Sequence, residues 1–168
     1  MATRRSLVTV DDLVLEPLVE AATTDASADE VTPPSTVGPA WTPTRIAWLH
    51  DFHRDRRTGL DGPAREIIWA ITVDQRVVGS VCLQRMERPG LLETGVWLTR
   101  SSRGHGVGGG DLAAALHEAG SLGFTAVRAE TTVNNAGALA LLEQLGFDLT
   151  RIGEGSAVQG LLVLEPQL

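Results

Sequence analysis

Residues 98–110 read Leu98-Thr-Arg-Ser-Ser-Arg103-Gly-His-Gly-Val-Gly-Gly-Gly110, in which an apolar strand end is followed by a glycine-rich turn and then by a helical pattern. Glycine leaves successive backbone N–H groups unobstructed, because it carries no Cβ. The N-terminus of the following helix adds positive potential at the same point. The stretch therefore predicts a site for an anion such as a phosphate or diphosphate.

Three kinds of phosphate-binding loop can be tested against this stretch. A P-loop requires Gly-Lys-Ser or Gly-Lys-Thr, and the chain has no lysine. A dinucleotide-binding turn requires a parallel strand–helix–strand unit, whereas the pattern upstream predicts antiparallel strands. The third pattern, Arg/Gln-x-x-Gly-x-Gly/Ala, is that of acyl-CoA loops, and residues 103–108 match every specified position.

The elements around the turn predict one α/β domain over residues 1–168 with a mixed, mostly antiparallel central sheet and helices on both faces. Residues 7–19 alternate apolar and polar side chains before Pro17 and are expected to form a first strand. Residues 20–42 are rich in proline and are interpreted as a substrate-side loop. Thr42-Pro43 is a typical helix start. Further strands are expected at 67–73, 77–83, 91–98, 126–133, 147–152 and 160–164, and helices at 43–57, 112–119 and 138–145.

Composition excludes several classes of function. The 168 residues suit one domain. A net charge of −7 argues against a nucleic-acid partner, which would need clustered basic residues. No apolar run is long enough for a membrane span, and the N-terminus lacks a signal-peptide pattern, so we expect a cytoplasmic protein. Cys82 is the single cysteine and there is no tyrosine, which rules out an intrachain disulfide and a phenolic acid or base.

Two further segments carry a family resemblance. Asn135-x-x-Ala-x-x-Leu-Leu-Glu-x-x-Gly-Phe147 resembles the second conserved element of the GCN5-related N-acetyltransferases (GNAT). Glu93-Thr-Gly-Val-Trp-Leu98 resembles the fourth strand of the RimJ/RimL-like branch, which acetylates ribosomal-protein N-termini. The resemblance implies the GNAT acyl-CoA N-acyltransferase fold, in which the fourth and fifth strands separate and acyl-CoA enters between them.

The resemblance also implies which residues hold acetyl-CoA, the co-substrate, with no metal involved. The end of the fourth strand would bind the pantetheine arm, the glycine-rich turn would cradle the diphosphate, and an asparagine would lie at the cofactor edge. On this sequence the cofactor-binding residues are Val96, Trp97, Leu98, Arg103, Gly104, His105, Gly106, Val107, Gly108, Gly109 and Asn135.

A base is needed because an amine must be neutral to attack a thioester. Strand alternation places Glu93, Gly95 and Trp97 on one face, which makes Glu93 the candidate general base, acting through a water molecule. The alternative is a carboxylate that satisfies a nearby backbone group or arginine. His50 and His53 lie on the helix expected at 43–57 and could touch substrate there, although a solvated helical face is the more common explanation for them. His117 is expected to be exposed.

Trp48, Phe52 and Trp97 are candidate substrate-binding residues, with an ordinary place in the core as the alternative. Relatives often carry tyrosine at the position of Leu142, and this chain offers no such acid. The resemblance therefore leaves two functions. One is an N-acetyltransferase acting on a protein N-terminal α-amine or a small-molecule amine. The other is a non-catalytic acyl-CoA sensor. A homodimer is also open, because dimers are frequent in the family.

Overall fold

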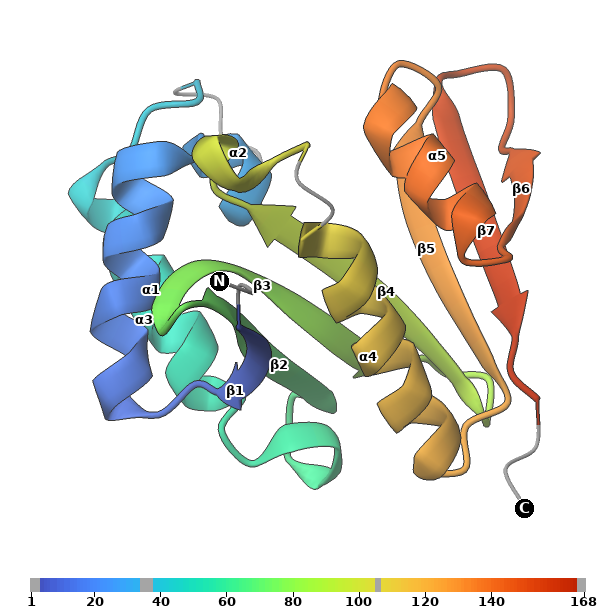
Figure 1. Cartoon of the computed structure of the whole chain (residues 1–168), viewed down its shortest axis with the longest axis horizontal. Coiled ribbons are helices and arrows are strands. Elements are labelled where there is room, and N and C mark those ends of the chain that lie inside the picture. Colours follow the sequence, from blue (N-terminus) through green and yellow to red (C-terminus); the bar gives the residue numbers. More distant parts are fainter. Residues whose placement is uncertain (1–3, 34–37, 105–106, 166–168) are drawn as a thin grey trace.

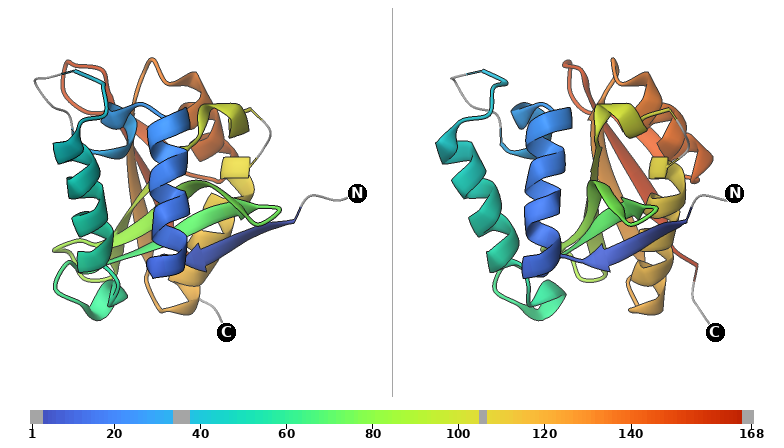
Figure 2. Two further views of the ribbon diagram at one scale, coloured as in Figure 1. Left: turned by 90° about the vertical axis from the view of Figure 1, so that its left-hand side faces the viewer. Right: turned by 60° about the vertical axis from the view of Figure 1, so that its left-hand side comes forward.

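The computed structural model describes residues 4–33, 38–104 and 107–165. One seven-stranded sheet, in the order β1-β2-β3-β4-β5-β7-β6, carries helices on both faces (Figures 1 and 2). Neighbouring strands are antiparallel except β4 and β5, which are parallel. This confirms the predicted mixed, mostly antiparallel α/β fold. The elements are β1 (Arg5–Thr9), α1 (Asp12–Asp25), α2 (Ala28–Val31), α3 (Pro43–Asp55), η1 (Gly59–Asp61), β2 (Glu66–Val73), β3 (Arg76–Arg85), β4 (Leu91–Leu98), η2 (Arg100–Ser102), α4 (Val107–Ser121), β5 (Ala126–Thr132), α5 (Ala136–Gln144), β6 (Asp148–Arg151) and β7 (Ala157–Val163).

Residues 7–19 differ from the sequence expectation. Only β1 is a strand, and α1 begins at Asp12 with Pro17 inside the helix. The Asp11 carboxylate caps α1 by accepting a hydrogen bond from the Val14 N–H at 3.0 Å. The buried residues of α1 recur at helical spacing and include Leu15 and Leu18. Residues 20–25, expected in a loop, continue the same helix, and α2 follows it.

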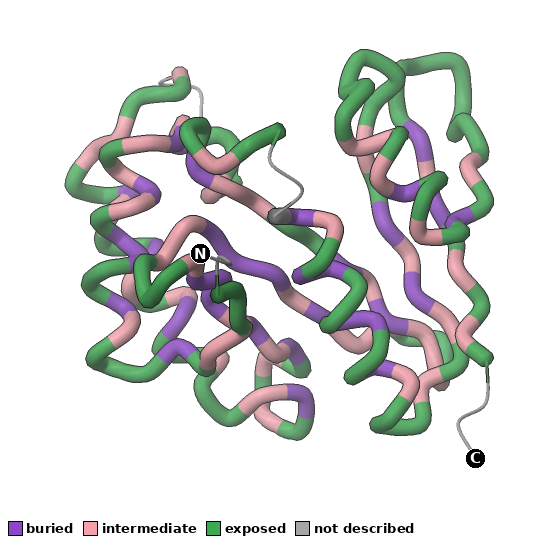
Figure 3. The backbone as a smooth tube through the Cα atoms, in the orientation of Figure 1, coloured by how far each residue is buried: buried purple, intermediate pink, exposed green. Residues whose placement is uncertain are grey.

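Two apolar clusters lie on opposite faces of the sheet. Ile71 of β2 belongs to the larger cluster, which α4 and α5 cover. Its neighbour Ala70 points the other way, into the smaller cluster under α1 and α3. Figure 2 shows these two helix layers on either side of the strands, and Figure 3 shows buried backbone running through the central strands.

The feature that positions the site is the short contact between β4 and β5. Their parallel register covers three pairs only and ends at Glu93 opposite Arg128. Beyond that pair the two strands separate, as Figure 1 shows, while β4 continues to Leu98. The expected separation of the fourth and fifth strands is therefore present.

Candidate functional site

A cavity of about 860 Å³ lies at the separated ends of β4 and β5. It collects residues from five parts of the chain: α2, the end of β4, the segment that follows η2, the first turn of α4, and α5 with its cap. The residues expected to hold acetyl-CoA that line it are Val96, Trp97, Leu98, Arg103, Gly104, Gly108, Gly109 and Asn135. His105 and Gly106 lie outside the described residues, and Val107 is the first residue of α4.

Backbone conformation and close packing explain the glycines at this cavity. Gly104 has a φ of +80°, in the left-handed region that favours glycine. A Cβ on Gly108 would lie 3.2 Å from Leu98 Cδ1. Because α4 begins at Val107, the N–H groups of its first turn have no partner within the helix. The cavity wall thus offers the bare, positively polarised backbone that a diphosphate requires.

Arg103 places a cation at this wall. Its Nε and Nη2 donate to the Leu98 carbonyl at 3.1 and 2.9 Å. Nη2 also donates to Oε2 of Glu30 in α2, which lines the same cavity. Sequence reasoning missed Glu30, because nothing in residues 20–42 marks it as a neighbour of a loop seventy residues away.

The α5 wall combines capping with cavity lining. The Asn135 side-chain oxygen accepts from the Ala138 N–H at 3.1 Å and so caps α5. One face of the helix continues the wall. The spacing of that face could have been read from the sequence, because residues three and four apart share a helix face. Its residues are Gly137, Ala138, Ala140, Leu141 and Gln144.

The candidate base lies at the point where the strands separate. Both Nε and Nη2 of Arg128 donate to Glu93 Oε2, at 2.9 and 2.5 Å. Glu93 is half-buried and is not part of the cavity lining. Each residue is the third of its strand, so the parallel register brings them together. The arginine partner considered as the alternative for Glu93 is therefore present.

Gly95 lies on the same face of β4 as Glu93, next to Cys82 of β3. Gly95 pairs with Cys82, and a Cβ on Gly95 would lie 3.3 Å from the Cys82 sulfur. Burial of that sulfur, together with the nearby Glu66 carboxylate, raises the pKa of the Cys82 thiol, although the residue as a whole is only half-buried. The thiol is therefore protonated and is not a nucleophile.

The candidate substrate-binding aromatics of α3 form a group of their own. Trp48 stacks on Phe52 with ring centroids 4.8 Å apart. The Arg56 guanidinium lies 3.7 Å from the Phe52 ring centroid, and its Nε donates to Glu66 Oε1 at 2.5 Å. Of the three aromatics, only Trp97 lines the cavity.

The histidines of α3 do not form the solvated face that was expected. His53 is 3% exposed, and His50 is half-buried with Nδ1 3.5 Å from Glu16 Oε1. Burial, together with the neighbouring Arg56 and His50, lowers the pKa of His53 to about 4. His53 is thus a neutral core residue. His117 on α4 is exposed, as expected.

Position 142 offers no acid for a leaving group. Leu142 is buried and belongs to the larger apolar cluster beneath α5. Any protonation of a departing thiolate must therefore come from solvent or from another residue.

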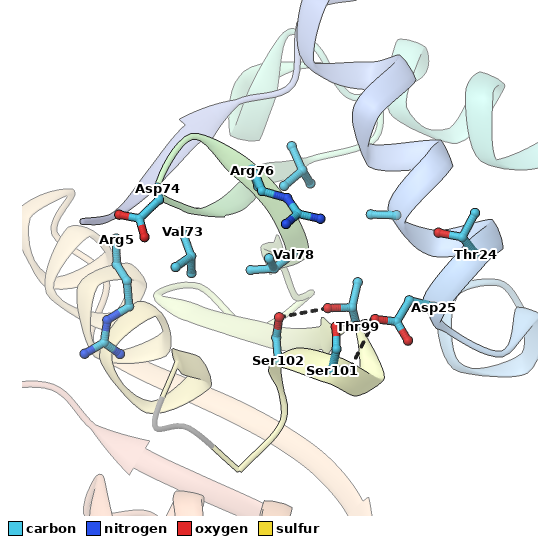
Figure 4. A pocket seen from close by; sticks show the side chains of 12 residues that line it. Arg5, Thr24, Asp25, Val73, Asp74, Arg76, Val78, Thr99, Ser101 and Ser102 are labelled. Carbon is cyan, nitrogen blue, oxygen red and sulfur yellow. Dashed lines mark hydrogen bonds between the residues drawn. The ribbon is translucent and has the colours of Figure 1, made fainter. Parts of the chain in front are cut away.

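A second cavity has a volume of about 580 Å³. Its lining includes Thr99, Ser101 and Ser102, which directly precede Arg103 in the sequence. It lies between the end of α1, the β2–β3 hairpin and residues 99–102 (Figure 4). There Ser101 donates from its N–H and hydroxyl to Asp25 at 3.2 and 2.5 Å, and Thr99 donates to Ser102. These contacts fasten the end of α1 to the segment that leads into Arg103.

The described residues form neither a cluster of metal ligands nor a membrane-spanning helix. Among residues 4–33, 38–104 and 107–165, no three histidine, cysteine, aspartate or glutamate side chains gather as metal ligands. Within the same ranges no helix is both long and apolar enough to cross a bilayer.

Comparison with known proteins places this geometry in context. The sequence profile described as "Acetyltransferase (GNAT) family" matches residues 34–147. The comparison with curated protein sequences gave no significant match.

Solved structures share the fold at low sequence identity. RimL, a ribosomal α-N-protein acetyltransferase solved with coenzyme A, is 14% identical with a TM-score of 0.73, over 97% of this chain and 96% of its own. The putative acetyltransferase yncA from Salmonella typhimurium, solved with acetyl-CoA, is 17% identical with a TM-score of 0.68, over 97% and 95%. The GNAT domain of PAT from S. lividans is 19% identical with a TM-score of 0.70, over 96% and 90%.

Proposed function

The chain belongs to the GNAT family of acetyltransferases, and on that premise we propose that it transfers an acetyl group from acetyl-CoA directly to a primary amine. The cavity at the separated strands is the observation that carries the proposal. Arg103, Gly104 and the first turn of α4 would hold the diphosphate. The pantetheine arm would lie along Val96–Leu98, beyond the last residue of β4 that pairs with β5.

The chemistry requires a neutral amine. Its lone pair attacks the thioester carbonyl carbon, a C–N bond forms, the C–S bond breaks and the thiolate leaves. Deprotonating an α-amine at pH 7 costs about 1 kcal/mol, whereas a lysine side chain costs about 4–5 kcal/mol. Glu93 would take the proton through a water molecule, with Arg128 fixing the orientation of the carboxylate.

The leaving group needs little help. A thiol has a pKa of about 8.5, so its thiolate is already a tolerable leaving group at neutral pH. A chain with Leu142 in the core and no tyrosine can therefore still turn over, with solvent protonating the thiolate.

For the acceptor we propose a low-pKa amine, either a protein N-terminal α-amine, as in the RimJ/RimL-like branch, or a small-molecule amine. The strand Glu93–Leu98 supports that branch. The net charge of −7 favours the approach of a cationic acceptor but selects no particular one.

A second candidate function is a non-catalytic acyl-CoA sensor. It is favoured by the engagement of Glu93 with two nitrogens of Arg128 and by the apolar residue at position 142. Both functions predict that acetyl-CoA binds, so only turnover separates them.

Calorimetry with acetyl-CoA is the first test, and we expect saturable binding. Release of free coenzyme A thiol is then measured against a panel of N-terminal peptides, polyamines and amino-sugar amines. Release above background with any of these supports the transferase. Binding without release supports the sensor, and the absence of binding contradicts both.

A further inference from the structure

An ion pair crosses the cavity in which we place the cofactor. Arg103 Nη2 donates to Glu30 Oε2, and both residues line the cavity. Their side chains are 44% and 37% exposed, so water and solutes reach the pair. A carboxylate in this position repels a diphosphate and also neutralises the cation that would bind it.

Glu30 is not needed to orient Arg103. The Leu98 carbonyl accepts from both Nε and Nη2 of the guanidinium, which holds the arginine against the end of β4. If Glu30 withdraws, the guanidinium keeps this anchor, while the Nη2 proton that Glu30 accepted becomes available to another anion. The contact with Glu30 is therefore exchangeable, whereas the contact with Leu98 is structural.

The neighbouring residue ties α2 to a different part of the molecule. Asp29 accepts from Arg45 Nη2 at 2.5 Å, and Arg45 is 7% exposed on α3. Arg45 also donates to the carbonyls of Gly38 and Ala40. Adjacent carboxylates thus hold α2 between two segments. Asp29 binds α3 through a part-buried contact, and Glu30 binds residues 98–104, here called the cofactor segment, through an exposed one.

We propose that Glu30 competes with the diphosphate of acetyl-CoA for Arg103, so that cofactor binding replaces the Glu30–Arg103 ion pair and releases α2 from the cofactor segment. The inference rests on the proposed function, because it assumes that the cavity receives acetyl-CoA. A diphosphate offers several charged oxygens to the guanidinium fork, whereas Glu30 offers one contact, so the exchange favours the cofactor. The Asp29–Arg45 contact keeps α2 on α3 afterwards.

The test is calorimetric titration of the full chain with coenzyme A, using the wild type, Glu30→Gln and Glu118→Gln. Glu30→Gln should lower the Kd about threefold to tenfold, since it removes both a competing ion pair and a repulsive charge. Glu118 is exposed near the far end of α4, so Glu118→Gln removes the same charge away from the cavity and should change the Kd less than about twofold. In an Arg103→Ala background the gain from Glu30→Gln should shrink, because the competition is gone.

The outcomes separate the two claims. If the wild type binds coenzyme A and Glu30→Gln binds equally or more weakly, this inference is overturned while the proposed function stands. If the wild type binds no coenzyme A, both fall. A gain of the same size in Glu118→Gln would assign the effect to net charge and overturn the inference.

Amide hydrogen exchange gives a second, independent measure. The Glu30 N–H donates to the Ser27 carbonyl at 3.0 Å, and the Thr32 N–H donates to the Ala28 carbonyl at 2.8 Å. Saturating coenzyme A should speed exchange at these two amides in the wild type. Glu30→Gln should show the faster exchange without coenzyme. Equal protection in all these states would overturn the release of α2.

Discussion

At the scale of single residues, the Glu93–Arg128 contact decides how the proposed reaction can run. Arg128 donates twice to one carboxylate oxygen, Oε2. The other oxygen has no hydrogen-bond partner among the described residues and can accept from a water molecule. A fixed carboxylate beside the point where the strands separate suits a base that works through such a water.

Glu93→Gln should lower kcat about a hundredfold to ten-thousandfold and flatten the pH–rate profile, because the amide keeps the shape but accepts no proton. The measurement is thiol release as a function of pH with the best acceptor from the panel. Glu118→Gln is the matched control. An unchanged pH profile would remove Glu93 from the role of base.

His53 gives stability a dependence on pH. Its pKa is about 4 in the folded chain and about 6.5 when unfolded. Between these values the unfolded chain binds more protons, so stability rises with pH through this window and levels off above about 6.5. Acidification from pH 7 to pH 4 should cost about 3 kcal/mol through this group. Urea unfolding at a series of pH values measures the loss, and His53→Gln should reduce it.

The exposed His117 supplies the control for that series. His117→Gln removes an imidazole from the surface and leaves the buried His53 in place, so it should leave the pH dependence of stability as in the wild type. The carboxyls of Asp12 and Asp25 act in a different range. Hydrogen bonds from Arg57 and Ser101 lower their pKa values, so their contributions are lost only at more acidic pH. Equal slopes for the wild type and His53→Gln would contradict the assignment.

At the scale of elements, the sequence was most informative where local chemistry and tertiary packing agree. Strands were predicted at 67–73 and 77–83, and between them Asp74 and Gln75 have φ values of +50° and +70°, as a two-residue hairpin requires. Thr42 was predicted as a helix cap and accepts from the Arg45 N–H at 3.2 Å. Both signals lie within four residues, so no distant partner is needed to fix them.

The first helix shows where such reasoning failed. Pro17 suggested that the secondary structure ends there, and Leu13 and Leu15 suggested the alternation of apolar and polar side chains that is typical of a strand. Leu13 is in fact 86% exposed, while Leu15 and Leu18 are buried at helical spacing. Proline removes one N–H and disfavours a helix interior, but packing of α1 on the smaller apolar cluster outweighs that cost.

Asn135 permits a prediction that separates its two roles. Asn135→Ala removes the cap of α5 and should cost about 1 kcal/mol of stability. Asn135→Asp keeps a capping oxygen but adds a negative charge to the cavity wall, so it should retain stability and weaken coenzyme A binding. Thermal unfolding and calorimetry of both variants measure the two effects. Unweakened binding by Asn135→Asp would place this residue outside the cofactor contacts.

At the scale of the whole molecule, stability depends on the larger apolar cluster between the sheet and α4 and α5. Leu92 is fully buried in it. Leu92→Ala should cost about 2–5 kcal/mol, through lost transfer energy and a residual cavity. The melting temperature should fall by about 2–4 °C for each kcal/mol.

Leu13→Ala is the matched control for this core substitution, because Leu13 is 86% exposed on α1. The same change of side chain there should shift stability by less than about 0.5 kcal/mol. Thermal unfolding of both variants measures the loss of stability. Comparable losses in Leu92→Ala and Leu13→Ala would contradict the assignment of the core.

The candidate site was predictable in part, for reasons that also belong to this scale. Residues 96–109 are close in sequence, so the strand end and the glycine-rich turn could be recognised together as one motif. Glu30 and Arg128 contribute through contacts that only the assembled sheet creates. Position 53 was expected on a solvated face because its burial depends on how α3 packs, which helical spacing alone does not reveal.

The brief pairing of β4 with β5 has a consequence for handling the protein. Past Glu93 and Arg128, β4 and β5 no longer pair with each other, so their facing backbone N–H and C=O groups lack a strand partner. Unpaired strand edges of this kind promote aggregation. Coenzyme A bound between β4 and β5 would hydrogen-bond to these unpaired backbone groups and so link the two parts of the sheet. Because it would bind only the folded chain, it would also stabilise the fold. Coenzyme A added during purification and storage should therefore raise the solubility and the melting temperature of the protein, even when no acceptor is present.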